Sequence, residues 1–145
     1  MSYEKPLFEG EGIKELIPQR DPIMMVDTFY DADETSCHTG LLIKADNLFC
    51  ENGEFQEPGL IEHIAQSASA YAGYKEKLKN SENPPVGYIG EIKKFKLFRR
   101  PKAGERLFTH IQTVSEIMNV SLIKTEAKVG DEVVASCQMK IFIRE

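Results

Sequence analysis

The pattern of apolar and polar positions predicts two strands, one long helix and then four further strands. Apolar runs that pass into alternating positions indicate strands at 22–31 and 37–46, each bounded by polar turn clusters. A short helix is expected before them at 12–18, where Pro18 ends it. Residues 47–59 hold two glycines, a proline and several acids, and we expect them to form a loop.

The long helix is expected from about Gly59 to Lys79, with Pro58 or Gly59 in its first turn. From Pro58 to Tyr74 the only formally charged side chain is Glu62. A helix with almost no charged face is buried nearly all round. We therefore expect this helix to be wrapped by its own sheet and to contact a second subunit.

Strand-like runs follow the helix at 86–99, 105–118, 119–129 and 132–144. The connections between the last three runs are short, which predicts an antiparallel meander. One helix against one antiparallel sheet defines an α+β, two-layer arrangement. A chain of 145 residues suits one domain with one core, so we expect a single domain over 1–145.

Composition excludes several classes of function. The chain is 41% hydrophobic and 28% charged, as globular proteins are, and no segment approaches the ~18 uninterrupted apolar residues of a membrane span. The N-terminal sequence lacks the basic and apolar regions of a secretory signal. Cys37, Cys50 and Cys137 match neither a disulfide framework nor a metal-binding spacing, which indicates a reducing cytoplasm. We expect no metal and no cofactor.

The net charge of −5 is unevenly distributed. Residues 1–58 carry 13 Asp and Glu against 4 Lys and Arg, whereas residues 93–102 carry six basic residues and no acid. An acidic protein with one basic strip is not typical of nucleic-acid-binding proteins. The strip is either a solvated strand face or a docking site for an acidic partner. Its candidate partner-binding residues are Lys93, Lys94, Lys96, Arg99 and Arg100.

Glu62 is the main candidate for chemistry. An unpaired buried carboxylate costs on the order of several kcal/mol, so it needs partners or a function. It either acts as an acid/base group or interacts with the dipole of the first helical turn. Gln66, one turn later, is placed to hydrogen-bond it. Gly59 is either an ordinary helix-start glycine or a position where a thioester carbonyl reaches the unpaired N–H groups, as in an oxyanion hole.

Four segments in order resemble the hot-dog fold 3-hydroxyacyl-[acyl-carrier-protein] dehydratases. LIPQRDPIMMVD (16–27) resembles the family's "LLPHRxPxLLVD", and EPGLIEHIAQ (57–66) resembles its helix start "MPGVLxxEAMAQ". Residues 89–107 resemble "IxxxKFxxPVxPGDxL", and the last strands fit the family's long meander. The chain looks closest to the dehydratase-like branch associated with aryl-polyene pigment assembly.

The resemblance implies a mechanism and partners. In the family, a loop histidine pairs with the helix glutamate of the other subunit and takes a proton from C2, while the glutamate helps the hydroxyl leave. Carried over, Glu62 matches the glutamate, Gln66 the glutamine, and Gly59 the amide that holds the thioester oxygen. The implied partners are an acyl carrier protein and a second subunit, in a homodimer, a higher oligomer or a heterodimer with a related chain. The expected substrate-binding residues are Cys50, Phe55 and Pro58.

The family's histidine is missing, because its position in the "GHFPxxPxMPG" loop falls on Cys50. His38 and His110 lie in strands, and His63 points away from Glu62 on a helix, so none is an evident replacement. Cys50 would act as a base only with a lowered pKa. Three hypotheses follow: a dehydratase, a thioesterase in which Glu62 alone activates water or attacks the thioester, and a non-catalytic acyl-binding or partner subunit.

Overall fold

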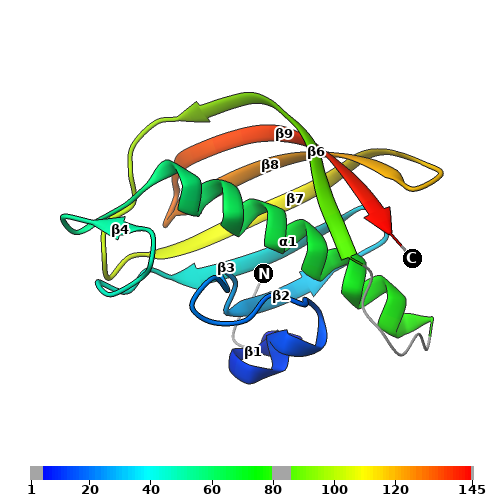
Figure 1. Ribbon diagram of the computed structural model, residues 1–145, viewed down its shortest axis with the longest axis horizontal. Helices are drawn as coiled ribbons and strands as arrows, with labels where there is room; N and C mark the ends of the chain where they lie inside the picture. The colour runs from blue at the N-terminus through cyan, green and yellow to red at the C-terminus, as the bar shows by residue number, and fades with distance from the viewer. Residues whose placement is uncertain (1–4, 80–85, 145) are drawn as a thin grey trace.

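An antiparallel sheet curves around one long helix in the computed structural model, which describes residues 5–79 and 86–144 (Figure 1). Within these residues the main sheet has seven strands in the order β1-β2-β3-β7-β8-β9-β6. Their bounds are β1 (Phe8–Glu9), β2 (Thr28–Ala32), β3 (Ser36–Leu42), β6 (Val86–Leu97), β7 (Arg106–Ile117), β8 (Val120–Val129) and β9 (Glu132–Arg144). The predicted α+β hot-dog arrangement is confirmed.

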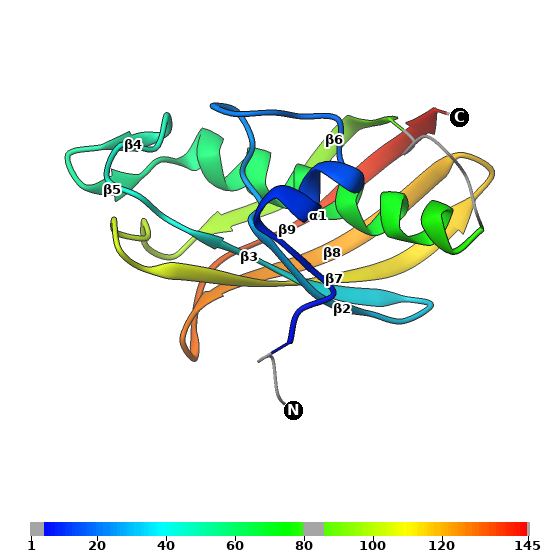
Figure 2. The same cartoon turned by 90° about the horizontal axis from the view of Figure 1, so that it is seen from below.

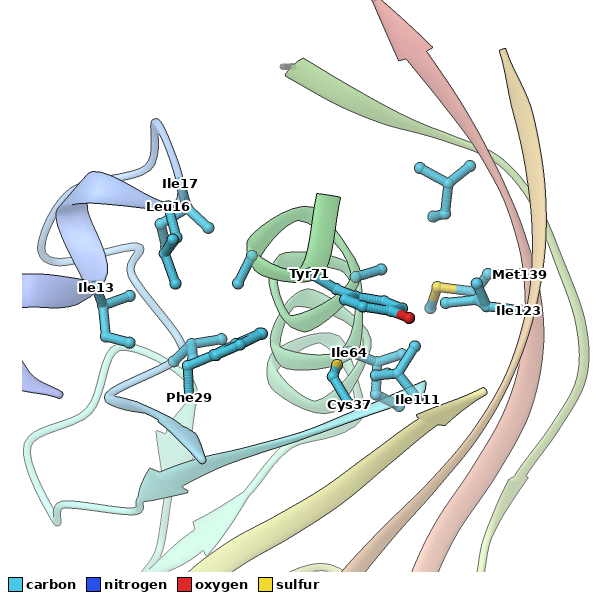
Figure 3. Close-up of a cluster of buried hydrophobic side chains, with 14 of the residues drawn as sticks. Ile13, Leu16, Ile17, Phe29, Cys37, Ile64, Tyr71, Ile111, Ile123 and Met139 are labelled. Atoms are coloured by element: carbon cyan, nitrogen blue, oxygen red, sulfur yellow. The ribbon is translucent and has the colours of Figure 1, made fainter. Parts of the chain in front are cut away.

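The helix α1 (Glu57–Leu78) lies between the sheet and an N-terminal layer that includes the 3-10 helix η1 (Gly10–Glu15), as Figure 2 shows. Figure 3 shows the same layers in side chains. Tyr71 points to Ile123 and Met139 of the sheet, while Leu16 and Ile17 cover the opposite side of the helix. No helix of the described residues is long and apolar enough to cross a bilayer.

The last three strands form the predicted meander, because β7 pairs with β8 and β8 with β9. The strand β6 pairs with β9 instead of β7, and β3 takes the place beside β7. The helix therefore separates two parts of the sequence that meet in one sheet. The bounds of the four long strands and of the helix agree with the predicted ranges to within about two residues.

Several early segments differ from the prediction. The short helix expected at 12–18 is the 3-10 helix Gly10–Glu15, and the strand expected at 37–46 is β3, which ends at Leu42. Residues 22–27 were expected to be strand, but β2 begins only at Thr28, because the backbone around Met25 bonds to side chains of α1. The expected loop at 47–59 contains a small hairpin of β4 (Cys50–Glu51) and β5 (Glu54–Phe55). Its turn is Asn52-Gly53, with φ of 52° and 79°, which are the left-handed values that this residue pair favours.

Candidate active site

Glu62 lies in the second turn of α1 and is half-buried. The predicted pair with Gln66 forms: Nε2 of Gln66 donates to Oε1 of Glu62 at 2.8 Å. On the same side of the helix, Pro58 is exposed and Ala65 is half-buried. The carboxylate is therefore held by a neighbour one turn away, on a side of the helix that its own chain leaves partly open.

Gln66 is itself fixed by the backbone of the preceding segment. Its Oε1 accepts the N–H of Met25 at 2.6 Å, and its Nε2 donates to the carbonyl of Ile23 at 2.8 Å as well as to Glu62. These three contacts determine the orientation of the side-chain amide, because the carbonyl and carboxylate oxygens only accept. The segment 23–25 is thus bonded to the helix, which explains why it is not part of the sheet.

His63 points the other way, into the space between the helix and the sheet, and is fully buried. Its Nδ1 lies 2.7 Å from the carbonyl of Met25, so Nδ1 carries the proton and donates. Its Nε2 lies 2.8 Å from Oγ1 of Thr109 and accepts from that hydroxyl. Burial lowers the pKa of His63, against opposing effects of the Met25 carbonyl and Asp27. His63 is therefore a neutral ring of fixed tautomer that faces away from Glu62.

A buried polar cluster continues from His63 across the core. Oγ of Ser67 donates to the carbonyl of His63 at 2.8 Å and lies 2.7 Å from Oγ1 of Thr39. Thr39 and Thr109 are directly opposite each other on β3 and β7. All four residues are fully buried. The polar side-chain atoms of these four residues thus have partners, as buried polar groups require.

Gly59 is needed for packing against its own chain. A Cβ at this position would lie 2.6 Å from Cβ of Phe49 and 2.7 Å from the ring of Phe55. Its N–H donates to the carbonyl of Gln56 at 2.9 Å. The glycine therefore allows two aromatic side chains to approach the helix start, and a thioester oxygen at its amide would share the donor with Gln56.

The other expected substrate residues lie in the hairpin and first turn before Glu62. Phe55 is fully buried, whereas Pro58 is exposed. Cys50 is half-buried and pairs with Phe55 across the hairpin. Burial and the nearby charge of Asp46 raise the pKa of the Cys50 thiol. Cys50 is therefore a protonated thiol at neutral pH and does not replace the missing histidine as a base.

The other two histidines lie on the outer face of the sheet, which points away from the helix. Nδ1 of His38 lies 2.8 Å from Oδ1 of Asp31. His38 also stacks on Phe108 and on His110, with ring centroids 5.1 Å and 4.8 Å apart. Asp31, His38, His110 and Glu126 are directly opposite one another on successive strands, and we call these four residues the outer row. All three histidines of the chain fall within the described residues, and each has its partners away from Glu62.

The basic strip is divided into parts with different surroundings. Arg99 forms ion pairs with Glu105 at 2.8 Å and Glu132 at 3.0 Å, and its hydrogen bond lowers the pKa of Glu105. Arg100 is exposed beside Pro101, whose carbonyl accepts the N–H of Phe55 in the hairpin before the helix.

The lysines of the strip are separate from Arg100. Lys93 and Lys96 lie on the outer face of the sheet. They are directly opposite Gln138 and Ser136 of β9, respectively. Lys94 lies between them in the chain and lines the same outer groove as Lys96.

A cavity of about 120 Å³ lies beside the C-terminal half of α1. Small side chains of the helix, Ala68 and Ala72, form one wall, and Ile123 and Ile141 of the sheet form another. Its rim carries the ion pair of Lys75 with Glu116. The described residues contain no cluster of three metal-binding side chains.

A hot-dog domain with a glutamate and a glutamine one turn apart at the start of its helix defines the class of acyl-thioester dehydratases that the sequence motifs indicated. A family model described as ApeP-like, ApeP dehydratase, matches residues 11–145. The chain belongs to the ApeP-like dehydratase family.

Individual relatives agree with this assignment. The chain is 30% identical to the 3-hydroxyacyl-[acyl-carrier-protein] dehydratase FabZ of Aliivibrio fischeri, over 100% of this chain and 99% of the relative. It is 27% identical to the corresponding protein of Lactiplantibacillus plantarum, over 94% and 95% of the two chains. In the dehydratase heterocomplex ApeI:P from Xenorhabdus doucetiae, a chain of 12% identity has the same fold, with a TM-score of 0.85 and coverage of 92% and 91%.

Reasoning from sequence singled out Glu62, Gln66 and Gly59 as candidates and predicted the bond between Gln66 and Glu62, but it missed the contacts that Met25 makes with Gln66 and His63. The contacts of Met25 with Gln66 and His63 join segments 41 and 38 residues apart, and that of His63 with Thr109 spans 46 residues. No local pattern reports such contacts. The hairpin before the helix, in contrast, had a signal in Asn52-Gly53, the residue pair typical of a tight hairpin turn.

Proposed function

We propose that the protein eliminates water from 3-hydroxyacyl thioesters carried on acyl carrier protein, and so forms trans-2-enoyl thioesters. The observation that carries this proposal is the placement of Glu62, which is held by Gln66 at the start of the helix and on its partly open side. Membership of a dehydratase family supports the reaction class, and relatives named for this reaction match the chain over nearly its whole length.

The reaction removes a proton from C2 and the hydroxyl from C3, and a double bond forms between these carbons as water departs. Glu62, in its acid form, donates a proton to the departing hydroxyl. A base must accept the proton from C2. The amide of Gly59, shared with Gln56, donates to the thioester oxygen and stabilises the charge that develops there. Cys50, Phe55 and Pro58 surround this end of the substrate, and the small side chains Ala68 and Ala72 leave room for the acyl chain farther along α1.

The base is proposed to come from a second subunit, because the partners of all three histidines lie away from Glu62. The strand β6 supports this arrangement: it is an edge strand of the sheet, and a long exposed edge favours pairing with another strand. Its exposed charged residues are Glu91, Lys93, Lys94 and Lys96, and Gly90 and Ile92 are exposed beside them. Two copies paired along this edge would bring lysines close together, whereas a related subunit with carboxylates there would not.

The carrier protein is proposed to dock near Arg100, because this exposed cation lies beside the hairpin that leads into the helix. Arg99 is already paired with two carboxylates, so the second set for an acidic partner is Lys94 and Lys96, together with Lys93, whose ion pair with Glu91 is longer at 3.8 Å. Arg100→Glu should raise KM for the carrier-bound substrate more than Lys96→Glu does. We propose a cytoplasmic location, in keeping with the three free cysteines.

The proposed function is tested by turnover of a 3-hydroxyacyl-carrier substrate, with enoyl product and free thiol followed together. The chain is assayed alone and after co-purification with a hot-dog subunit that carries a histidine before its helix. We expect enoyl product from the pair, and a loss of at least about 100-fold in kcat when Glu62 is replaced in Glu62→Gln.

Other outcomes assign other functions. Free thiol without enoyl product indicates a thioesterase, and ligand binding without either product indicates a non-catalytic subunit. Enoyl product from the chain alone means that Glu62 acts without a partner's histidine. Unchanged activity in Glu62→Gln removes Glu62 from its role. Light scattering at micromolar concentration tests whether the chain associates with a second subunit. A monomer in every mixture would contradict the proposal that a second subunit supplies the base.

A further inference from the structure

Glu62 is the last member of a continuous series of hydrogen bonds that begins in the sheet. Thr109 of β7 donates to Nε2 of His63 at 2.8 Å, and Nδ1 of His63 donates to the carbonyl of Met25 at 2.7 Å. The N–H of Met25 donates to Oε1 of Gln66 at 2.6 Å, and Nε2 of Gln66 donates to Glu62 at 2.8 Å. We call these five residues the inner network.

The direction of every bond in the inner network is determined. The carbonyl of Met25 only accepts, so Nδ1 of His63 carries the proton and Nε2 must accept. The hydroxyl of Thr109 must then donate to Nε2. The N–H of Met25 only donates, so Oε1 of Gln66 faces it and Nε2 faces Glu62. One orientation of each side chain satisfies all of these contacts at once.

His63 holds the carbonyl side of the Met25 backbone, whose N–H side orients Gln66. Met25 is bonded through its carbonyl to His63 and through its N–H to Gln66, and both side chains come from the same helix one turn apart. A shift of the Met25 backbone would therefore move the acceptor side of Gln66 and, with it, the donor that faces Glu62. His63 occupies a position at which the dehydratase motif quoted above has alanine, so the family's catalytic set does not contain it.

We propose that His63 is a positioning residue for Glu62, acting through Met25 and Gln66 and itself oriented by Thr109. His63 does not touch the substrate, because it is fully buried on the sheet side of the helix. Its function is to keep Met25 in the single position from which Gln66 presents its N–H to the carboxylate. The inference rests on the proposed function of Glu62, and its test therefore includes a measurement that needs no turnover.

The first test changes Thr109, which is distant in the series from Glu62. Thr109→Val removes the hydroxyl and keeps the branched shape, while Thr109→Ser keeps the hydroxyl. Thr125→Val is the matched control, because Thr125 is a buried threonine of the neighbouring strand whose hydroxyl bonds near Cys137. We expect kcat per folded molecule to fall about tenfold in Thr109→Val, with KM changed less than about twofold, and to stay near wild type in the other two.

The second test changes His63 itself. His63→Asn keeps an N–H near the position of Nδ1 and loses the contact with Thr109, whereas His63→Leu loses both. We expect kcat per folded molecule to fall in the order wild type, His63→Asn, His63→Leu. A purely structural residue would lower the folded fraction in these variants without changing kcat per folded molecule.

The third measurement follows the side-chain amide signals of Gln66 by nuclear magnetic resonance, with assignment by Gln66→Met. Its Nε2 donates to both Ile23 and Glu62 in the structure, so the signals report its position directly. We expect them to move in Thr109→Val and to stay in place in Thr125→Val. Unmoved signals in Thr109→Val overturn the proposal whatever the activity. If wild type turns the substrate over, an unchanged kcat in Thr109→Val and His63→Leu also overturns it.

A wild-type chain that forms no enoyl product even when paired with a histidine-bearing subunit contradicts the proposed function instead. In that case the Gln66 signals alone decide whether His63 positions the carboxylate, so the two failures are distinguishable.

Discussion

Two histidines of this chain have partners at nearly equal distances, on opposite sides of one sheet. His63 lies 2.7 Å and 2.8 Å from its partners in the inner network, and His38 lies 2.8 Å from Asp31 in the outer row with His110 and Glu126. His63 is fully buried, whereas the side chains of His38 and Asp31 are 19% and 41% exposed. The distances are alike, but losing a partner costs more free energy at the buried His63 than at the partly exposed pair of His38 and Asp31.

The outer row also shows why a histidine beside a carboxylate is weak evidence for an active site. Asp31 and His38 have the hydrogen-bond geometry of a catalytic dyad, yet they lie across the sheet from Glu62 and the helix start. The inner network has no such dyad, but it ends at the carboxylate that the family motif assigns to catalysis. The comparison implies that substitutions on the helix-facing side of the sheet have large effects on stability and turnover, and that substitutions on its outer face have small ones.

The largest expected effect is the loss of His63. His63→Leu leaves the carbonyl of Met25 and the hydroxyl of Thr109 buried without partners, and each costs about 1–3 kcal/mol. We expect the free energy of unfolding to fall by about 2–4 kcal/mol in urea titrations at pH 7.5. The same change on the outer face, His110→Leu, should cost less than about 1 kcal/mol because that ring is only half-buried. Equal losses in the two variants would contradict the comparison.

Two buried glycines, Gly73 of α1 and Gly40 of β3, allow a comparison that depends on packing alone and not on hydrogen bonds. In Gly73→Ala the added Cβ would lie 2.1 Å from the carbonyl oxygen of Leu16, so backbone must move, and we expect a loss of about 1–3 kcal/mol. In Gly40→Ala the Cβ meets the ring of Tyr30 at 3.0 Å and the carbonyl of Leu107 at 3.1 Å. These distances are longer than the one at Gly73, and the nearest neighbour is a side chain and not backbone, so a smaller loss is expected there. Thermal unfolding of both variants checks the order.

The next largest difference is expected in how the free energy of unfolding depends on pH at His63 of the inner network and at His110 of the outer face. Burial lowers the pKa of His63 from its ordinary 6.5, so below 6.5 the unfolded chain binds more protons than the folded one. The stabilisation from neutral His63 is complete above pH 6.5 and is lost as the pH falls toward the folded-state pKa. Burial, and then the charge of His38, lower the pKa of His110 in the same direction.

Urea titrations between pH 7.5 and 5.5 measure this dependence. We expect His63→Asn to remove more of the slope of unfolding free energy against pH than His110→Asn does, because His63 is the more deeply buried ring. A steeper change in His110→Asn would contradict the assignment of the main titrating group to the inner network.

The elements that sequence predicted well are those whose signal is local. The apolar helix with its isolated Glu62 and the four alternating strands each carry their pattern within a short window, and the spacing from Glu62 to Gln66 sufficed to predict their hydrogen bond. The segment at 22–27 was predicted wrongly because its apolar residues resemble a strand, while its hydrogen-bond partners lie on a distant helix. The alternation of side chains cannot report where backbone groups find their partners.

Residue roles were harder to predict than elements. Gly59 was interpreted either as an ordinary helix-start glycine or as a position that lets a ligand reach the backbone amide, and the structure adds that a Cβ there would meet Phe49 and Phe55. Arg99 was grouped with the candidate partner-binding residues of the strip, and the structure adds that Glu105 and Glu132 approach it from segments 6 and 33 residues away. In both cases the side chains that contact the residue lie outside the motif. The motif therefore identifies the residue but does not predict what it contacts.

The smallest effect is expected from the outer dyad. Asp31→Asn keeps the size of the side chain and removes its charge, and the pair it weakens is partly solvent-exposed, so the loss of stability should stay below about 1 kcal/mol. Turnover of the 3-hydroxyacyl substrate should remain within about twofold of wild type, because no contact of the inner network involves Asp31. Parallel assays of Asp31→Asn and Glu62→Gln measure the difference. If Asp31→Asn lowers kcat as strongly as Glu62→Gln, the outer row is coupled to the chemistry, and the sheet does not separate the two histidine sites as their burial and partners indicate.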